Sequence, residues 1–310
     1  MPADDETYIM TKIEGWLGLS RPPFYTLGIL PFCLGTFLAW RLDHVFHIPA
    51  FILGFMGIFM VILSTYHAGE YFTRVEDERS KHLFRNPLSG ESGTLLDLIF
   101  RRSGPLRSGF VAISLALLIG IILQFGLKTG PFTILLGCLG ALPGFFYSTR
   151  PIRPADKGYG ETLIAFFYGW LPIAASFYIQ RGYIAHCIHW MALPIGLSIF
   201  NVILLNEFPE HTSNPTVSKM NLLRRLGRAK GVSLYCLTSI LSWFSMYYSL
   251  NTGIPRKALY IYLPVMAMSA CISLMMAGKR YENPLVLEIL CGLNIAVHLG
   301  TMAAYFLAFL

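Results

Sequence analysis

Long apolar stretches separated by short polar connections run along nearly the whole chain. A membrane-spanning helix takes roughly 20 mostly apolar residues, with about 17 as the lower limit, and nine stretches come close to that length. They cover approximately residues 24–40, 48–66, 109–127, 131–147, 162–179, 184–205, 231–250, 257–277 and 285–308. The pattern predicts an all-α fold, a polytopic membrane bundle of about nine transmembrane helices that forms a single domain over residues 1–310.

Three connections, residues 67–108, 148–161 and 206–230, are longer than the others and hold most of the charge. Together with the N-terminal tail and the loop after the eighth stretch, they carry 19 Lys and Arg, against 5 in the alternate loops. Basic residues gather in cytoplasmic loops. The N-terminus and the long loops are therefore expected in the cytoplasm and the C-terminus outside. If the source is bacterial, the membrane is expected to be the inner one.

Composition supports a membrane protein and removes other classes. Of the 310 residues, 55% are hydrophobic and 13% charged, and the mean hydropathy is +0.56, whereas soluble domains carry about 25% charged residues. The net charge of +7 follows the loop asymmetry and gives no support to nucleic-acid binding. The six cysteines lie in or against apolar segments without CxxC spacing, which does not fit a disulfide framework.

Two of the long loops begin with similar polar patterns. Polar groups recur at i, i+3 and i+7 in each, as Glu70, Thr73 and Asp77 after the second stretch and as Glu207, Glu210 and Asn214 after the sixth. If the helices continue past the membrane edge, this spacing puts each trio on one helix face. The interval of four stretches suggests a duplicated four-helix unit with a ninth helix added.

Acidic helix faces on the cytoplasmic side suit a divalent cation. Mg²⁺ prefers oxygen ligands and is commonly bound by one or two carboxylates together with substrate phosphates, and it neutralises a departing diphosphate. Cations nearby could complete such a site, since arginine matches phosphate oxygens in bidentate fashion. They are Arg74, Arg79, Arg150, Arg153, Lys157, Lys219, Arg224 and Arg225. Charged helix faces that contact only water or lipid headgroups explain the same spacing. The sequence pattern therefore leaves open whether these residues form a metal–diphosphate site.

Three segments resemble the UbiA superfamily of intramembrane prenyltransferases. Residues 20–35 are similar to its first helix, 147–153 with 158–161 to its central cytosolic loop, and 206–227 to its second acidic motif with the flanking sequence. The resemblance runs along nearly the whole chain and is nearest to the branch with menaquinone-type dihydroxynaphthoate prenyltransferases. It implies a bundle of nine helices with its motif loops in the cytosol.

The resemblance also implies a reaction and a site. A polyprenyl group would pass from a prenyl diphosphate to a small lipophilic acceptor, an aromatic quinone precursor, within the membrane and with Mg²⁺ as cofactor. The catalytic positions are Asp77, Glu210 and Glu70, and the metal ligands are these three with Asn206 and Asn214. The diphosphate-binding positions are Arg74, Arg150, Arg153, Lys157 and Lys219.

The acidic motifs depart from the family pattern. The first, Asn-x-x-x-Asp-x-x-x-Asp in the family, reads Gly69, Thr73 and Asp77 here, and the second, Asp-x-x-x-Asp, reads Glu210 and Asn214. Formal negative charge is lost at two of four acidic positions, which weakens metal–diphosphate binding.

The motif losses favour an alternative function, a non-catalytic relative that binds an isoprenoid, a quinone or a partner protein. A transporter is disfavoured, because transporters place charged groups near mid-membrane and the apolar stretches here are nearly free of charge, with Glu288 the main exception.

Overall fold

The computed structural model describes residues 22–80, 104–149, 152–210 and 220–310, and in these ranges the chain forms helices and no strand. The first half contains α2 (Pro22–Asp43), α3 (Ile48–Ser80), α5 (Gly104–Ile121), η2 (Ile122–Gly126), α6 (Thr133–Phe146) and η3 (Pro154–Asp156). Next come α7 (Gly160–Ile164), η4 (Ala165–Trp170), α8 (Leu171–Arg181) and α9 (His186–Glu210). The chain ends with α10 (Leu222–Leu226), α11 (Arg228–Ser249), η5 (Leu250–Thr252), α12 (Lys257–Ala277), η6 (Arg280–Glu282) and α13 (Pro284–Ala308).

Every predicted apolar stretch coincides with a helix or with consecutive helical pieces. Seven of the described helices are long and apolar enough to cross a membrane, namely α2, α3, α5 with η2, α7 to α8, α9, α12 and α13. Helix α6 has only 14 residues, and α11 carries Arg228, Lys230 and several serines. The predicted all-helical bundle is therefore confirmed, whereas the count of nine spans is not.

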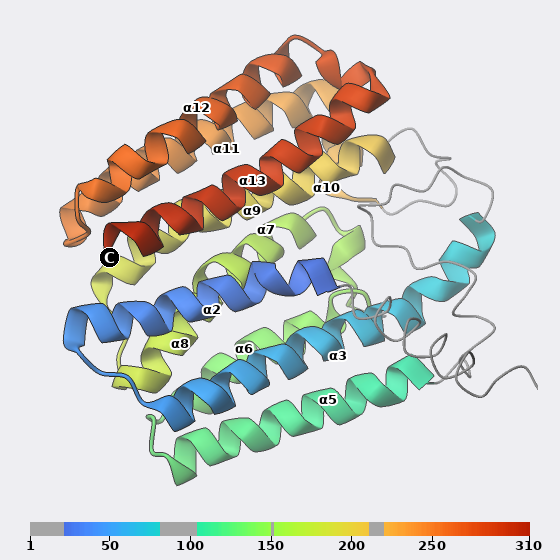
Figure 1. Ribbon diagram of the computed structural model, residues 1–310. Coiled ribbons are helices and arrows are strands. Elements are labelled where there is room, and N and C mark those ends of the chain that lie inside the picture. The colour runs from blue at the N-terminus through green and yellow to red at the C-terminus, as the bar shows by residue number, and fades with distance from the viewer. Residues whose placement is uncertain (1–21, 81–103, 150–151, 211–219) are drawn as a thin grey trace, which may run out of the picture.

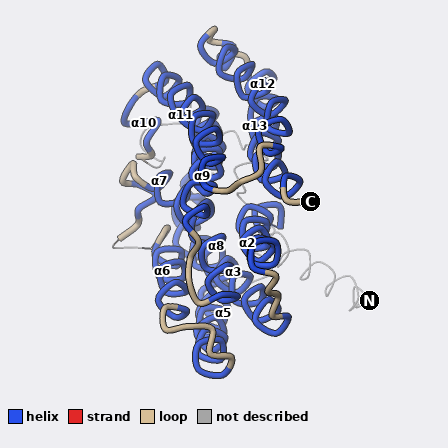
Figure 2. Tube along the Cα trace, turned by 90° about the vertical axis from the view of Figure 1, so that its left-hand side faces the viewer, coloured by secondary structure: helices blue, strands red, loops and turns tan. Residues whose placement is uncertain are grey.

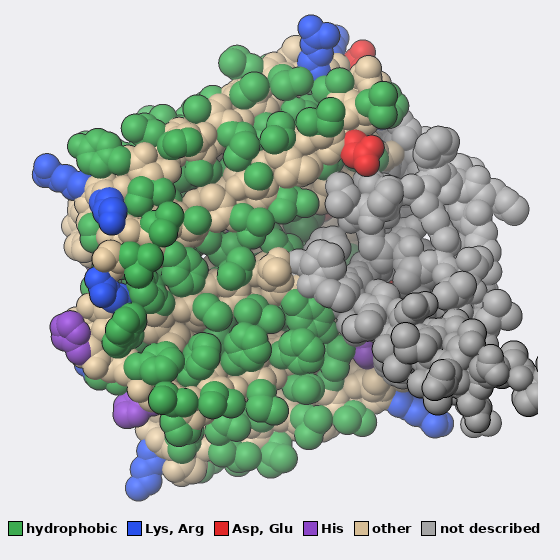
Figure 3. All heavy atoms as spheres, in the orientation of Figure 1, with side chains coloured by type: hydrophobic (Ala, Val, Ile, Leu, Met, Phe, Trp, Pro, Cys, Tyr) green, Lys and Arg blue, Asp and Glu red, His purple; other side chains and the backbone are tan. Residues whose placement is uncertain are grey.

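The lateral surface of the bundle is apolar. Figure 3 shows a broad face of hydrophobic side chains, with charged side chains at its rims. Large residues such as Phe244, Tyr260 and Leu274 are between 67% and 75% exposed. Such a surface is unstable in water and suits hydrocarbon. The chain is an integral, multi-pass membrane protein.

The helices form two unequal parts. Helices α11, α12 and α13 lie on one side of the molecule and α3, α5 and α6 on the other, with α2, α8 and α9 between them (Figures 1 and 2). The main hydrophobic core belongs to the first side: α9 packs against α11 and α13, and α2 packs against α8. Helix α3 packs mainly against α5 and α6, where buried side chains are fewer.

Polar side chains tie α8 to the α2–α3 connection at the end of the bundle opposite the long loops. The Arg181 Nε lies 2.6 Å from the Asp43 Oδ2, and the Tyr183 hydroxyl donates to the same oxygen at 2.7 Å. This hydrogen bond to the carboxylate raises the pKa of the exposed Tyr183 hydroxyl. Gln180 accepts from the His47 amide and donates to its carbonyl, so α8 fixes where α3 begins.

Glycine permits one close helix crossing near the centre of the fold. A Cβ atom on Gly169 of η4 would lie 2.5 Å from the Gly196 Cα and 2.9 Å from its nitrogen on α9. These are backbone atoms, which cannot rotate away. Small residues allow membrane helices to approach closely, and this pair sets the distance between η4 and α9.

Gly169→Ala is therefore expected to destabilise the fold by about 1–3 kcal/mol, the usual cost of overpacking, and to lower the melting temperature in detergent. Gly292→Ala is the matched control, because a Cβ on this exposed α13 glycine meets nothing within 4 Å. Alanine is favoured over glycine within a helix by about 0.5–1 kcal/mol, so the melting temperature of the Gly292→Ala variant should not fall. Equal melting temperatures for the two variants would contradict the close crossing.

Candidate functional site

A cavity of about 650 Å³ lies within the α3 side of the bundle. Its described lining comes from α2, α3, α5, α6, the α7–η4–α8 run and α9, and none of it from α11, α12 or α13. The cavity therefore occupies the part of the molecule where the core is thinnest.

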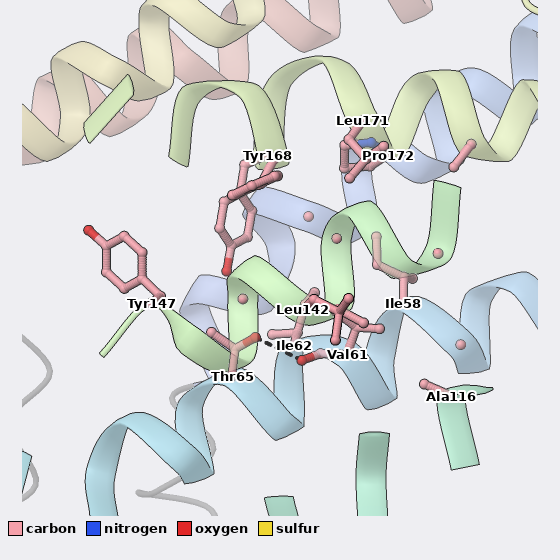
Figure 4. Close-up of a pocket in the computed structure, with 18 of the residues that line it drawn as sticks. Ile58, Val61, Ile62, Thr65, Ala116, Leu142, Tyr147, Tyr168, Leu171 and Pro172 are labelled. Carbon is pink, nitrogen blue, oxygen red and sulfur yellow. Dashed lines mark hydrogen bonds between the residues drawn. The ribbon is translucent and has the colours of Figure 1, made fainter. Parts of the chain in front are cut away.

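Most of the cavity wall is apolar. Figure 4 shows Ile58, Val61 and Ile62 of α3 near Leu142 of α6, with Leu171 on another wall. The Thr65 hydroxyl adds little polarity, because it donates to the Val61 carbonyl at 2.9 Å.

Glycines widen the cavity along α6. Gly137, Gly140 and Gly144 all line it, and their spacing of three and four residues puts them on one helix face. A Cβ on Gly137 would meet nothing within 4 Å. This face of α6 contributes space where side chains would otherwise stand.

Polar groups gather at one end of the cavity. Its lining there includes Tyr147, Ser148, Glu161, Asn206, Glu207 and Asn221. They stand where α6 and α9 end and where α7 and α10 begin, at the end of the bundle where α3 ends and α5 starts (Figure 1). From Gly54 to Thr65 the lining of α3 runs about 16 Å at 1.5 Å per residue. The cavity is thus an elongated apolar space with one polar end.

The short helix α10 holds two carboxylates together. The Leu222 amide donates to the Glu161 Oε1 at 2.9 Å, and the Leu223 amide donates to the Glu207 Oε2 at 3.2 Å. Asn221 caps α10 by accepting from the Arg224 amide at 3.0 Å. Glu161 from α7 and Glu207 from α9 are thereby fixed to consecutive residues of one backbone segment.

A glycine turn places α10 against the start of α7. Gly158 has a φ of +73°, and a Cβ there would lie 2.5 Å from the Arg225 Cδ. Only glycine meets both conditions without strain. The sequence Gly158-Tyr159-Gly160 thus allows the central loop to pack on α10 just before Glu161.

Two oxygens at the polar end lack partners. The Glu161 Oε2 and the Asn206 Oδ1 are buried without a hydrogen bond from any described residue, and Glu161 is only 2% exposed. Leaving a buried acceptor unpaired costs about 1–3 kcal/mol, and more for a charged group. In a cavity wall, such acceptors are available to a hydrogen-bond donor or a cation of a bound molecule.

The oxygen chemistry of this end fits Mg²⁺. Glu161, Asn206 and Glu207 offer carboxylate and amide oxygens, which hard divalent cations prefer. Within the described ranges, however, no three His, Cys, Asp or Glu side chains come together as a metal cluster.

Of the five predicted metal ligands, the structure describes the side chains of Glu70 and Asn206. Glu70 lies on α3 and is 5% exposed. Asn206 lies on α9 and lines the cavity. Asp77 belongs to α3 and Glu210 ends α9, both helices continuing past the predicted membrane edge, but their side chains lie outside the description. Asn214 lies outside the described residues.

Two of the five predicted diphosphate-binding residues, Arg153 and Lys157, have described side chains. Arg153 is buried at 5% exposure and has a left-handed φ of 36°, and Lys157 is exposed. Arg74 belongs to α3, but its side chain is not described, and Arg150 and Lys219 lie outside the described residues.

Sequence reasoning did not assign Glu161 and Asn221 to the site. Glu161 stands directly before an apolar stretch, and a carboxylate at a membrane helix end is a signal for function. Asn221 precedes a short basic helix whose existence no periodicity predicts.

Known proteins share this architecture. The family described as the UbiA prenyltransferase family matches residues 28–285. A 2-carboxy-1,4-naphthoquinone phytyltransferase of Synechocystis sp. is 23% identical over 238 residues, 73% of this chain and 73% of its own. A 1,4-dihydroxy-2-naphthoate octaprenyltransferase of Escherichia coli is 23% identical over 219 residues, 70% of both chains.

Solved structures agree with the fold. A digeranylgeranylglyceryl phosphate synthase superposes with a TM-score of 0.69 at 14% identity, over 96% of this chain and 98% of that one. A UbiA homolog from Archaeoglobus fulgidus bound to GPP and Mg²⁺ gives a TM-score of 0.66 at 14% identity, over 95% and 99%. At such identity the likeness establishes the fold alone.

Asn221→Ala tests whether α10 anchors the two carboxylates. Loss of this cap should cost about 1 kcal/mol and loosen the helix, so amide hydrogen exchange of residues 221–227 should rise several-fold. Asn283→Ala, which removes the cap of α13, is the control and should leave that exchange unchanged. Unchanged exchange in Asn221→Ala would show that other contacts hold α10.

Proposed function

Because this chain belongs to the UbiA prenyltransferase family, we propose that it transfers a polyprenyl group from a prenyl diphosphate to a naphthoate-type aromatic acceptor inside the membrane. Prenyl transfer is the activity that defines the family. The naphthoate acceptor is favoured by the names of the two curated relatives, which act on 2-carboxy-1,4-naphthoquinone and 1,4-dihydroxy-2-naphthoate compounds.

The shape of the cavity supports this proposal most directly. A prenyl diphosphate is a long apolar chain with a highly charged head, and the cavity is an elongated apolar space with oxygen ligands at one end. The apolar walls accommodate the chain between helices and exclude water from the reacting carbon. A water-free site protects an allylic cation from hydrolysis.

The polar end would position the head group. Asp77, Glu210 and Glu70, with Asn206 and Asn214, would hold Mg²⁺, and Glu207 adds a carboxylate that α10 already orients. When bound, Mg²⁺ neutralises the negative charge that grows on the departing diphosphate. Arg74, Arg150, Arg153, Lys157 and Lys219 would bind the remaining phosphate oxygens.

We propose that this end of the cavity faces the cytoplasm. The helices that line it begin or end at the long basic connections of the sequence, and the positive-inside rule puts such connections in the cytoplasm. Water-soluble diphosphate and Mg²⁺ would enter and leave there, while the C-terminus lies outside. In a bacterium the membrane would be the inner one.

A non-catalytic relative is the second candidate. The changes at Gly69, Thr73 and Asn214 remove motif side chains, and the same cavity would hold an isoprenoid or a quinone without turning it over. Turnover separates the two functions directly.

Purified protein in detergent should release diphosphate from radiolabelled geranyl to octaprenyl donors only with Mg²⁺, and should prenylate 1,4-dihydroxy-2-naphthoate in preference to 4-hydroxybenzoate. Asp77→Ala and Glu210→Ala should each lower turnover at least 100-fold, because a buried metal–phosphate interaction loses a charged ligand.

Glu282→Ala is the matched control, since Glu282 is exposed on η6 and distant from the cavity lining. It should keep its turnover within about twofold. Binding of the donor without any turnover in folded protein would instead support the non-catalytic relative.

Gly137→Leu tests whether the glycine face of α6 holds the prenyl chain. No atom lies within 4 Å of a Cβ there, so the leucine should fill the cavity without unfolding the protein. Gly137 lies about 15 Å along α6 from Tyr147, beyond the reach of a short donor. Turnover of octaprenyl diphosphate should fall at least tenfold and that of geranyl diphosphate less than threefold, and an equal fall for both would contradict the placement.

A further inference from the structure

Glu161 is a polar group of the cavity whose hydrogen bonding is incomplete. One carboxylate oxygen is fixed by the Leu222 amide at 2.9 Å. The other, Oε2, is buried and has no partner among the described residues, although the side chain lines the cavity at 2% exposure. A carboxylate held by one oxygen is oriented in advance and keeps strong accepting capacity at the other.

The charge of Glu161 restricts what can approach it. A diphosphate oxygen is negative and is repelled by a buried carboxylate. The partner must therefore donate a hydrogen bond or carry positive charge. The acidic ends of α3 and α9 already supply carboxylates for a cation, and Mg²⁺ is usually bound by only one or two of them with phosphates and water.

The surroundings of Glu161 suit a flat aromatic ring. Ile164, Phe167 and Tyr168 follow it in the cavity wall, and the last two lie in the π-helical turn η4, a distortion that occurs often at functional sites. Figure 4 shows Tyr168 extending from its helix towards α6, and its hydroxyl interacts with Tyr66 of α3. The unpaired Glu161 Oε2 therefore adjoins a wall of apolar and aromatic side chains.

We infer that Glu161 binds the acceptor substrate, its Oε2 accepting a hydrogen bond from an aromatic hydroxyl group while Leu222 holds Oε1. The inference rests on the proposed function, since it assigns the acceptor of that reaction. It makes Glu161 a specificity-determining residue for hydroxylated aromatic acceptors.

The first experiment needs no variant. Affinities of wild-type protein for 1,4-dihydroxy-2-naphthoate and for its 1,4-dimethoxy analogue are compared by equilibrium binding in detergent without donor and under reducing conditions. A site built to accept from hydroxyl groups rejects an analogue that cannot donate, so the dimethoxy compound should bind at least tenfold more weakly. Equal affinities would overturn the inference.

Glu161→Gln then assigns the preference to this residue. Its carbonyl oxygen can still accept from Leu222, while its amide donates where Oε2 accepted. The preference for the dihydroxy compound should shrink at least tenfold, with the donor KM changed less than twofold. A raised Mg²⁺ requirement or donor KM with an unchanged acceptor preference would place Glu161 with the diphosphate and overturn the inference.

Glu282→Gln, on the exposed η6 helix, is the matched control for loss of one carboxylate. Because binding of the acceptor is measured without turnover, absence of prenyl transfer in wild-type protein would reject the proposed function and leave the acceptor site testable. Turnover with an acceptor preference that Glu161→Gln does not alter would reject the acceptor site alone.

Discussion

Hydrocarbon offers no hydrogen bonds, so every backbone polar group within the membrane must be satisfied by the chain itself. This constraint makes the described spans helical and leaves unpaired amides and carbonyls only at helix ends. The chemistry of the protein follows from it. The polar residues of the cavity stand where α6 and α9 end and where α7 and α10 begin, because only there do loops and free amides meet the apolar interior.

The sequence was sufficient to predict the helical class and the positions of the apolar segments, because length and hydropathy determine them. It also pointed to the ends of α3 and α9, where helix continues through Asp77 and to Glu210. The assignment of the metal ligands stays a prediction, for Asn206 and Glu70 as well as for the residues whose side chains are not described. Glu161 could not be assigned to the site from the sequence, because its position depends on a hydrogen bond to α10. This helix has five residues with Asn221 as its N-cap, and it is too short to be predicted from periodicity.

The two sides of the bundle differ in how many of their buried side chains are polar and hydrogen-bonded across helices. Around α13, buried polar side chains bond across helices: Ser198 bonds with the His298 Nδ1 at 2.8 Å, and Tyr235 donates to Asn294 at 2.9 Å, while the Asn294 Nδ2 and the His298 Nε2 have no partner among the described residues. Internal hydrogen bonds of this kind bind membrane helices together. Around the cavity, glycines and apolar residues dominate instead. The part of the bundle that contains the main hydrophobic core therefore packs against the part that contains the cavity, and α9 contributes to both.

The shared anchorage on α10 has a mechanical consequence. Glu161 and Glu207 come from different helices, yet each accepts a hydrogen bond from one of two adjacent amides in the same short segment. A displacement of α7 or α9 alters one carboxylate, whereas a displacement of α10 alters both at once. Residues 222 and 223 thus couple the two carboxylates, so that the surroundings of one cannot be rearranged through this segment without moving the other.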